Sequence, residues 1–403
     1  MSLTQRAKRI KPSPTLAISA KAKQLKAEGQ DVIGFGAGEP DFDTPEFIKE
    51  AAIKAIQDGM TKYTAVGGIP ELKNAIIEKF KKDNGLEFAA NEILVSPGAK
   101  YSLYLAMQAL LEKDDVMIIP APYWVSYSAQ AELADGGFRL INTTEKTGFK
   151  ITGSELEAVI ADIKKDGKNP KAFLINSPSN PTGAAYEDEE LIELANILHK
   201  NNIWVITDEI YEFLVYDGYK HNSILALAPE IRPHTIVING VSKTYSMTGW
   251  RIGYAGGPAD VIKAMTNIQS QSTSNPTSIS QAAALAALTG PQECVEEMRV
   301  QFDKRRKYIV DRLNAIDGIS CYSPKGAFYV FPNISGVFGK KFEGKAINSG
   351  SDFADYLLDT VKVAVVPGVG FGNDDFVRMS YATSMEDIEK GLDRIEEAVN
   401  KLS

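Results

Sequence analysis

The chain has 403 residues, of which 44% are hydrophobic and 24% are charged, and its formal net charge is −8 at pH 7. These proportions are ordinary for globular proteins and exclude a disordered chain. The length leaves room for two or three domains at roughly 150 residues each. The negative charge argues against nucleic acid as a partner, because affinity for nucleic acid depends on lysine and arginine neutralising phosphates.

The two cysteines and three histidines lie far apart in the sequence, so their spacing predicts no metal site and no disulfide framework. No apolar run approaches the ~20 residues of a membrane span, and the basic N-terminus lacks the apolar core of a signal peptide. We therefore expect a cytoplasmic protein without a membrane partner. The basic stretches at residues 6–11 and 79–82 are expected to be exposed to solvent.

The middle of the chain alternates apolar, β-rich runs with helical patterns. Six strands are predicted, at residues 92–96, 116–119, 172–176, 204–207, 235–239 and 252–255. Between them, apolar residues recur every three or four positions at 103–111 and 187–201, which predicts helices. This alternation predicts an α/β fold with a mostly parallel sheet and helices on both faces. Ligands of such sheets bind beyond the carboxyl ends of the strands.

A second, smaller α/β domain is predicted after the central one. A charged helical pattern runs from Pro291 to about Ile316, shorter strands follow at 327–331, 363–366 and 377–381, and a last helix begins at Met385. A strand at 32–35, in the N-terminal part of the chain, is expected to belong to this domain as well. We predict a large domain at 48–290 and a discontinuous small domain made of 1–47 and 291–403.

Two predicted strands of the large domain end in loops that could hold a ligand. The first leads into Pro97-Gly98-Ala99-Lys100 and a helix, whose first backbone N–H groups could bind a phosphate. Strand–glycine–helix turns are nevertheless common without any ligand. The third strand ends in the proline-rich turn 177–183, which would hold the amide of Asn180 in a fixed place beside the sheet.

Two further strand ends carry charged side chains. Asp208 directly follows the fourth strand, where a buried carboxylate requires a cationic partner such as a pyridinium nitrogen. Glu209 is the neighbouring alternative, and we favour Asp208 because it comes first after the strand. Lys243 follows the fifth strand. An isolated lysine is usually exposed, but one beside a buried strand readily shifts its pKa, as Schiff-base chemistry requires.

Three motifs occur in the order seen in one enzyme family. Asn180-Pro181-Thr182-Gly183, Asp208 with Tyr211, and Ser242-Lys243 with Gly249-Trp250-Arg251 resemble the fold-type I aminotransferases, which depend on pyridoxal 5′-phosphate (PLP). The resemblance extends from about Lys11 to the last residue. It implies the type I PLP-transferase fold, with a seven-stranded sheet in the large domain, and PLP as the cofactor.

The resemblance also implies the catalytic roles. Lys243 would bind PLP as a Schiff base and move a proton between the substrate Cα and the cofactor C4′. Asp208 would keep the pyridine nitrogen protonated, and Tyr211 and Asn180 would hydrogen-bond the phenolic oxygen. The phosphate would be held by Arg251 and by four residues near it: Gly98, Ala99, Lys100 and Ser242.

Two aromatic residues acquire roles from the same resemblance. Trp124 would stack on the pyridine ring and contact substrate, although the residue pattern alone makes it a core aromatic. Tyr63 corresponds to a tyrosine that reaches the phosphate of the neighbouring subunit. The active unit would therefore be a homodimer with shared active sites.

Substrate recognition would come from the small domain. Arg378 lies inside the apolar run 377–381 and corresponds to an arginine that binds the substrate α-carboxylate. The planar guanidinium suits this role, because it can donate two parallel hydrogen bonds to a carboxylate. An exposed arginine on an edge strand is the alternative. Gly38, in a stretch of alternating glycines at 36–41, resembles the glycine loop near that carboxylate, and Asn180 would lie there too. The stretch is not a dinucleotide fingerprint, because a proline-containing loop follows it.

Lys100 and Thr15 resemble the residues with which a bacterial and plant subgroup of aspartate aminotransferases holds the distal carboxylate. Some members of that subgroup also use prephenate. The better-known aspartate aminotransferases use an arginine from the partner subunit instead, and the segment 269–276 contains none. Lys100 could alternatively cap an exposed helix.

The implied reaction transfers the amino group of L-aspartate to 2-oxoglutarate, giving oxaloacetate and L-glutamate by a ping-pong route through pyridoxamine phosphate. Three other substrate preferences stay open, for aromatic amino acids, alanine or kynurenine. A PLP-dependent β-lyase on the same fold is the remaining alternative. It would release pyruvate from sulfur amino acids without any oxo acid acceptor.

Overall fold

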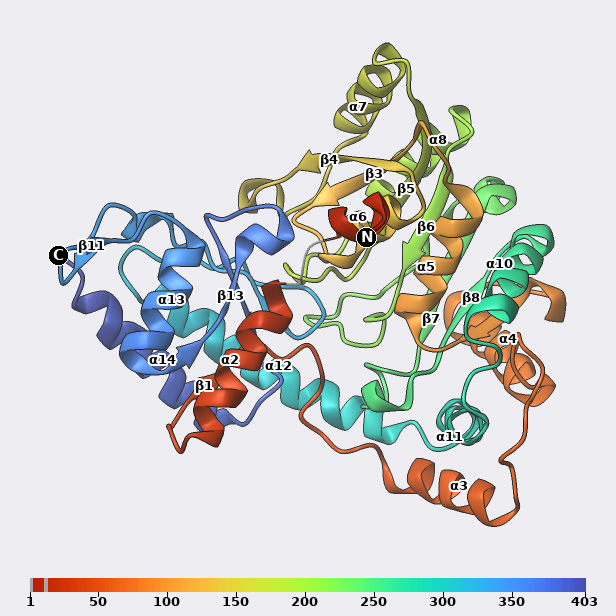
Figure 1. The fold of residues 1–403 in the computed structure, drawn as a ribbon, viewed down its shortest axis with the longest axis horizontal. Helices are drawn as coiled ribbons and strands as arrows, with labels where there is room; N and C mark the ends of the chain where they lie inside the picture. The colour runs from red at the N-terminus through yellow and green to blue at the C-terminus, as the bar shows by residue number, and fades with distance from the viewer. Residues whose placement is uncertain (1–2, 11–13) are drawn as a thin grey trace.

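A seven-stranded sheet forms the centre of the larger lobe in the computed structural model, which describes residues 3–10 and 14–403 (Figure 1). The spatial order is β2-β8-β7-β6-β5-β3-β4. β8 runs antiparallel to both of its neighbours, and the other adjacent pairs are parallel. The strands are β2 (Ile93–Ser96), β3 (Asp115–Ala121), β4 (Gly137–Asn142), β5 (Asn169–Asn176), β6 (Trp204–Asp208), β7 (Thr235–Gly240) and β8 (Gly253–Gly256). The predicted α/β fold with a mostly parallel sheet is confirmed.

Strand β4 has no counterpart among the strands predicted from the residue pattern. It lies at the edge of the sheet, where it pairs with β3 alone. Only Ile141 is buried, three residues are partly buried, and Arg139 and Asn142 are exposed, so β4 lacks the apolar run of a central strand. The seventh strand followed from the family resemblance alone.

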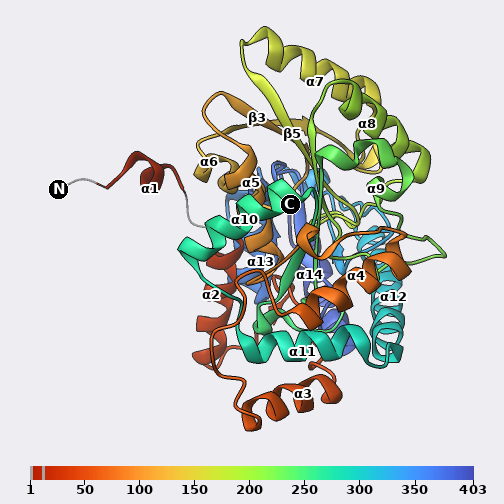
Figure 2. The ribbon, with the colours of Figure 1, turned by 90° about the vertical axis from the view of Figure 1, so that its right-hand side faces the viewer.

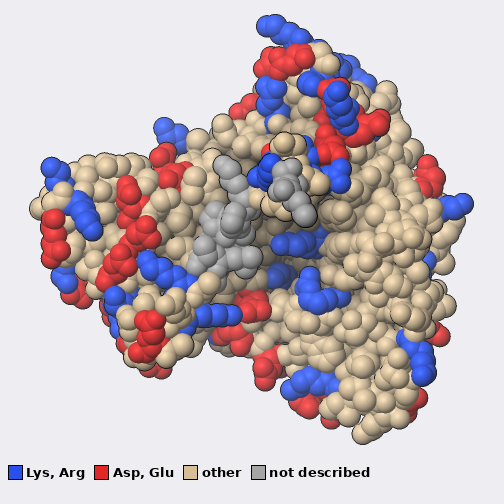
Figure 3. Space-filling model, viewed as in Figure 1, with Lys and Arg blue, Asp and Glu red and all other residues tan. Residues whose placement is uncertain are grey.

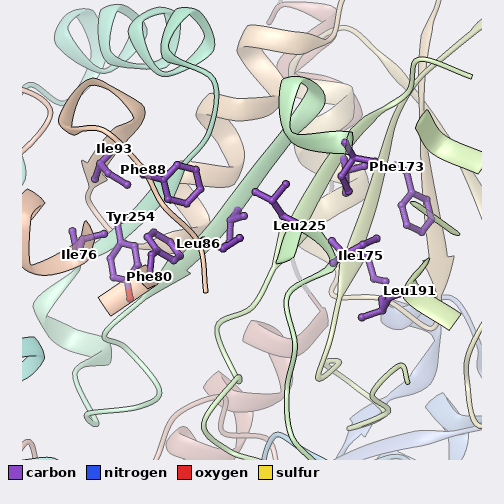
Figure 4. Packing of buried hydrophobic residues seen from close by; sticks show 14 of the residues in the cluster. Ile76, Phe80, Leu86, Phe88, Ile93, Phe173, Ile175, Leu191, Leu225 and Tyr254 are labelled. Atoms are coloured by element: carbon purple, nitrogen blue, oxygen red, sulfur yellow. The ribbon is translucent and has the colours of Figure 1, made fainter. Parts of the chain in front are cut away.

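Helices cover both faces of the sheet. One face carries α5 (Ala99–Leu110), α6 (Ser126–Leu133) and α10 (Ala259–Ser272), whose buried residues share an apolar cluster. The opposite face carries a larger cluster, part of which Figure 4 shows. Successive residues of a strand belong to different clusters, as Leu94 and Val95 do, because their side chains point to opposite faces of the sheet. The larger cluster includes α4 (Pro70–Asn84), α7 (Gly153–Lys165), α8 (Asp188–Lys200), α9 (Ile224–Leu227) and α11 (Ser278–Thr289).

The smaller lobe contains segments from both sides of the sequence, drawn red and blue in Figure 1. β1 (Ile33–Gly34) pairs in parallel with β12 (Val363–Ala364), and α2 (Pro14–Ala27) packs against β12. A three-stranded antiparallel sheet has the order β13 (Val366–Pro367), β14 (Val377–Ser380), β9 (Tyr329–Val330). These pairings support one discontinuous small domain, whose exact boundaries stay a prediction. Its other elements are β10 (Lys341–Phe342), β11 (Lys345–Ala346), α12 (Glu293–Asn314), α13 (Gly350–Val361) and α14 (Met385–Asn400).

The view in Figure 2 shows two peripheral parts of the molecule. Helix α3 (Glu46–Gln57) packs against α11, and the short helix α1 (Gln5–Arg9) protrudes at the side of the molecule. Arg6 and Arg9 of α1 form ion pairs with Asp135. In the part of the chain that the structure describes, no helix combines the length and the apolar character needed to cross a membrane.

The expected exposure of the basic stretch 79–82 is wrong for Lys79. Its side chain is buried, on the same face of α4 as Leu72 and Ile76, and its ammonium forms an ion pair with the carboxylate of Glu212. Lys79 is buried because it lies on the apolar face of α4. Ile76 and Lys79 follow Leu72 by four and seven positions, and residues with this spacing share one side of a helix. The opposite charge that compensates the buried ammonium comes from a distant part of the sequence.

Candidate active site

The carboxyl ends of β5, β6 and β7 face one cavity of about 330 Å³, which residues of the smaller lobe complete. The face seen in Figure 3 is hollowed near its centre, and lysine and arginine side chains gather around the hollow. The cavity brings together most of the site residues predicted from the sequence. They are Gly38, Ala99, Lys100, Trp124, Asn180, Asp208, Tyr211, Ser242, Lys243, Arg251 and Arg378.

Lys243 follows β7 and projects into this cavity. Its Nζ donates a hydrogen bond to the backbone oxygen of Gly38 at 2.5 Å. Burial lowers the pKa of Lys243 to about 8, Glu39 opposes that shift, and the positive charges of Arg251 and Arg378 add to it. At pH 7 about a tenth of this amine would be unprotonated, far more than of an ordinary lysine, which suits a nucleophile and a proton acceptor.

Asp208, the last residue of β6, is buried and also faces the cavity. It accepts hydrogen bonds from the Tyr127 hydroxyl at 2.7 Å and from the backbone N–H of Ile210 at 3.3 Å. Burial raises the pKa of Asp208 to about 6 although both hydrogen bonds oppose that shift. Glu209 instead accepts hydrogen bonds from Thr207 and Ser223 and does not line the cavity. The structure thus supports the choice of Asp208 over Glu209.

The start of α5 and the side chain of Arg251 lie close together. Gly98 has φ +94°, and a Cβ atom built there would lie 2.2 Å from Nη2 of Arg251. Similarly, a Cβ atom on Gly253 would lie 2.1 Å from the backbone nitrogen of Ala99. The first N–H groups of a helix have no partner inside the helix. With the guanidinium of Arg251 and the nearby Ser242, they form a site suited to a phosphate.

Arg378, on β14, is only 3% exposed, so the alternative of an exposed edge arginine is excluded. Its Nη1 donates to Oδ1 of Asn180 at 3.1 Å and its Nη2 to the backbone oxygen of Gly36 at 3.0 Å. Among the described residues no carboxylate pairs with it, and its Nε has no hydrogen-bond partner. Burial lowers the pKa of Arg378. A buried guanidinium with spare donors at a cavity suits a carboxylate ligand.

Tyr211 and Asn180 are both oriented by neighbours that the sequence did not reveal. The hydroxyl of Tyr211 lies 3.1 Å from that of Tyr329. The backbone N–H of Asn180 donates to Oδ1 of Asn176 at 2.9 Å, and Nδ2 of Asn176 donates to the backbone oxygen of Asp208 at 2.8 Å. Asn176 could have been recognised as the polar residue that ends a predicted strand. Tyr127 and Tyr329 gave no comparable signal.

Lys100 and Trp124 line the cavity together. The ammonium of Lys100 lies 4.8 Å from the centre of the Trp124 ring, a cation–π contact, and the residue as a whole is exposed. Local burial, followed by repulsion from Arg251, lowers the pKa of Lys100. This position is compatible with binding a substrate carboxylate. It leaves open the alternative that Lys100 simply covers the start of an exposed helix.

Of the predicted site residues whose surroundings the structure describes, Gly98 and Tyr63 are not among those that line the cavity. Tyr63 is 91% exposed. This exposure is compatible with a contact in a neighbouring subunit. Thr15 belongs to α2, but its side chain lies outside the described part of the structure.

A group of buried ionisable side chains includes Glu209, which directly follows β6. Donor atoms of Glu209, Glu212 and His221 all lie within 4.8 Å of one another. Lys79 pairs with Glu212, and Nε2 of His221 lies 3.3 Å from Oε2 of Glu209. Burial alone would lower the pKa of His221, but the attraction of Glu209 and Glu212 raises it above 6.5. With His221 protonated, two cations balance two anions, so the group needs no metal ion for charge balance.

The cavity supplies what each polar part of PLP requires. The buried carboxylate of Asp208 suits a protonated ring nitrogen, and the amine of Lys243 suits the aldehyde. The start of α5 with Arg251 suits the phosphate. The spare donors of Arg378 remain for a carboxylate of the substrate. The residues present therefore fit this cofactor.

Comparisons with known proteins identify the family of the chain. Residues 30–395 match the family model of class I and II aminotransferases. An aspartate aminotransferase of Bacillus sp. strain YM-2 is 52% identical over 397 residues, which cover 98% of this chain and 99% of that protein. An aspartate/prephenate aminotransferase of Nitrosomonas europaea is 48% identical over 398 residues, which cover 98% and 99%. The crystal structure of the aspartate aminotransferase from Rhizobium meliloti is 47% identical and matches with a TM-score of 0.95, covering 100% of both chains. The chain therefore belongs to the class I and II aminotransferases and is a PLP-dependent enzyme.

Proposed function

We propose that the enzyme transfers the amino group of L-aspartate to 2-oxoglutarate and so forms oxaloacetate and L-glutamate. The observation that carries this proposal is the presence of Lys243, Arg378 and Lys100 in one cavity. Arg378 offers a buried guanidinium for the α-carboxylate, and Lys100 offers a second cation for the distal carboxylate of a dicarboxylic substrate. The names of the relatives from Bacillus and Nitrosomonas support the same substrate class.

PLP supplies an aldehyde that captures the amino group and a ring that withdraws electrons from the substrate Cα. Arg378 would bind the α-carboxylate with two parallel hydrogen bonds and thereby fix the direction of the Cα–H bond. Lys243, with its pKa lowered to about 8, would take the proton from the substrate Cα and deliver it to the cofactor C4′. In the second half-reaction it would carry a proton in the opposite direction, onto Cα of the new amino acid. Both half-reactions would use the same carboxylate site, which explains a ping-pong order.

The other cavity residues would hold and tune the cofactor. Asp208 would present its negative charge to the ring nitrogen, with Tyr127 keeping the carboxylate in place. Tyr211 and Asn180 would hydrogen-bond the phenolic oxygen. The phosphate would be held by Arg251, Ser242 and the start of α5, which comprises Gly98, Ala99 and Lys100. The ring of Trp124 would cover the pyridine ring.

The first test is the visible absorption spectrum of the purified, PLP-loaded enzyme. We expect L-aspartate to remove the visible band and 2-oxoglutarate to restore it. A band that responds to alanine or an aromatic amino acid but ignores aspartate would contradict the proposed substrate. A protein that shows no band even after PLP is supplied would contradict the cofactor site itself.

A variant of Lys100 tests the distal carboxylate site. Lys100→Met should raise the KM for aspartate by roughly 10- to 100-fold, because a hydrogen bond between two charged groups contributes about 1.5–3 kcal/mol. The KM for alanine should change little. Lys113→Met removes an exposed lysine outside the cavity and is the matched control. Equal effects on aspartate and alanine would assign Lys100 to the cofactor or to the helix rather than to specificity.

Prephenate is a second candidate substrate, because the Nitrosomonas relative is named for it. Its two carboxylates could use the same two cations, and its ring could lie near Trp124. The test is consumption of prephenate by the PLP-loaded enzyme with L-glutamate or L-aspartate as the donor. Absence of turnover would remove prephenate from the substrates of the enzyme. Release of pyruvate from sulfur amino acids without an oxo acid would instead favour the β-lyase.

A homodimer in the cytoplasm completes the proposal. Tyr63 is 91% exposed in the single chain, which supports a position at the neighbouring subunit's site. Cys294 and Cys321 are not joined in a disulfide, as is usual for proteins of a reducing compartment.

A further inference from the structure

We infer that Tyr329 is a positioning residue that acts on the active site through Tyr211, by donating its hydroxyl proton to the Tyr211 oxygen. The inference rests on the proposed function, because it assumes that Tyr211 in turn donates to the phenolic oxygen of PLP. It assigns a role to a residue that neither the sequence motifs nor the expected cofactor contacts include.

The position of Tyr329 is fixed by contacts in three directions. It lies on β9 opposite Ser380 of β14 and is only 1% exposed. Its ring centre lies 4.5 Å from the guanidinium carbon of Arg378. Its hydroxyl lies 3.1 Å from that of Tyr211, and a Cβ atom on Gly38 would lie 3.4 Å from it. Tyr329 thus reaches from the smaller lobe to a residue of the larger lobe at the cavity wall.

The number of protons decides what this contact can do. Within the described chain, the hydroxyls of Tyr211 and Tyr329 have only each other as hydrogen-bond partners. Each hydroxyl carries one proton. If Tyr211 donates to Tyr329, no proton of Tyr211 remains for a ligand. If Tyr329 donates to Tyr211, the proton of Tyr211 is free to point into the cavity.

A negatively charged oxygen in the cavity selects the second arrangement, because only that arrangement offers it a proton from Tyr211. Hydrogen bonds in a chain strengthen one another in a low-dielectric interior. A proton donated by Tyr329 therefore makes Tyr211 a stronger donor. Burial raises the pKa of Tyr329, and the charge of Arg378 and the hydrogen bond with Tyr211 oppose that shift, so the Tyr329 hydroxyl keeps its proton at neutral pH and can donate it.

The alternative is that the contact merely satisfies two buried hydroxyls. The test is the pH titration of the visible band of the PLP-loaded enzyme, in the wild type, Tyr329→Phe, Tyr211→Phe and the double variant. Phenylalanine keeps the ring and its contact with Arg378 but removes the donor. Losing a donor to the negative phenolic oxygen lets that oxygen retain a nearby proton to higher pH. The apparent pKa of the titration should therefore rise.

We expect Tyr211→Phe to raise the apparent pKa most and Tyr329→Phe to raise it by about 0.3–0.5 units, a two- to threefold change in proton affinity. The double variant should titrate like Tyr211→Phe alone. Tyr381→Phe is the matched control, because it removes another buried tyrosine hydroxyl, which donates to Ala327 at 3.0 Å and lies outside the cavity. The control should leave the titration unchanged.

Three results would overturn the inference. An unchanged titration in Tyr329→Phe, with a shift in Tyr211→Phe, would make the contact structural and leave the proposed function intact. If the apparent pKa of the double variant were higher than that of Tyr211→Phe alone, Tyr329 would act without Tyr211. An unchanged titration in Tyr211→Phe would refute the assumed role of Tyr211 itself.

Discussion

Lys243 differs from the other lysines of the chain in how its amine is surrounded. Burial and the charges of Arg251 and Arg378 lower its pKa from 10.5 to about 8, even though Glu39 opposes the shift. In the PLP-free protein, an amine-specific reagent should therefore modify Lys243 with a midpoint near pH 8. Exposed lysines of the same sample should need a pH about two units higher. Peptide mass spectrometry after modification at a series of pH values checks this, and a midpoint near 10 for Lys243 would contradict it.

His221 should make the stability of the protein depend on pH. Its pKa in the folded state is raised above 6.5 because the attraction of Glu209 and Glu212 outweighs the effect of burial. Because this pKa is raised on folding, the protonated His221 stabilises the folded state, and this stabilisation is fully present below pH 6.5, the pKa of histidine in the unfolded state. It is lost as the pH rises through the higher pKa of the folded state.

The replacement His221→Gln tests that dependence. It should lower the free energy of unfolding more at pH 6 than at pH 9, by on the order of 1 kcal/mol, since a hydrogen bond or ion pair with a charged group is lost only where His221 is protonated. Urea denaturation of both proteins at both pH values measures the difference. An equal loss at the two pH values would contradict a change in the protonation of His221 between them.

Some site residues could be predicted from the sequence and others could not, for a physical reason. Asp208 and Lys243 each follow a buried strand directly, so strand prediction places them at the ligand-binding edge of the sheet. Tyr127 and Tyr329 are recognisable only through their partners, which lie 81 and 118 positions away in the sequence. Contacts of that range exist only after folding, and no local pattern encodes them.

Among the secondary-structure elements, the start of α5 depends most on one residue. Gly98 combines φ +94° with a hypothetical Cβ atom 2.2 Å from Arg251, so Gly98→Ala must displace that guanidinium. We expect the affinity for PLP to fall at least tenfold, roughly 1.4 kcal/mol. A PLP titration followed by absorbance measures the change.

Gly85→Ala is the matched control for that variant. Gly85 also has a positive φ, +66°, at the end of α4, but a Cβ atom there would meet nothing within 4 Å. This variant should lower the free energy of unfolding by about 1 kcal/mol through backbone strain alone. Its affinity for PLP should be unchanged. If both variants lost PLP equally, the loss would come from strain and not from Arg251.

Strand prediction from the sequence succeeded where burial is complete. β6 and β7 are covered on both faces, and their apolar runs are the pattern that distinguishes buried strands. β4 was not predicted because it lies at an edge with one side half-exposed. The reversed direction of β8 was not predicted either, because residue pattern indicates a strand but not its direction.

The proposed dimer leads to a complementation test. Tyr63→Ala and Lys243→Ala should each be strongly impaired as pure proteins, for different reasons. If Tyr63 serves the site of the neighbouring subunit, a mixed dimer contains one site with both residues intact. Unfolding and refolding the two variants together should restore activity, up to about a quarter of the wild-type value for random pairing with one intact site per mixed dimer.

Each variant refolded alone is the control for that experiment. Neither should regain activity. A mixture that stays as impaired as its components would mean that each subunit supplies all residues of its own site. The mass of the refolded species, measured by light scattering, establishes in parallel whether dimers form.

The pairing of Ile33 with Val363 also has a consequence for protein synthesis. Ribosomes produce the chain in sequence order, and domains generally fold as units while this happens. The seven strands between Ile93 and Gly256 emerge long before β12 exists to receive β1. Lys243 and Arg251 can therefore be in place while Arg378 is still untranslated. A nascent chain would acquire its phosphate site first and its carboxylate site last, so it could hold its cofactor before it could act on a substrate.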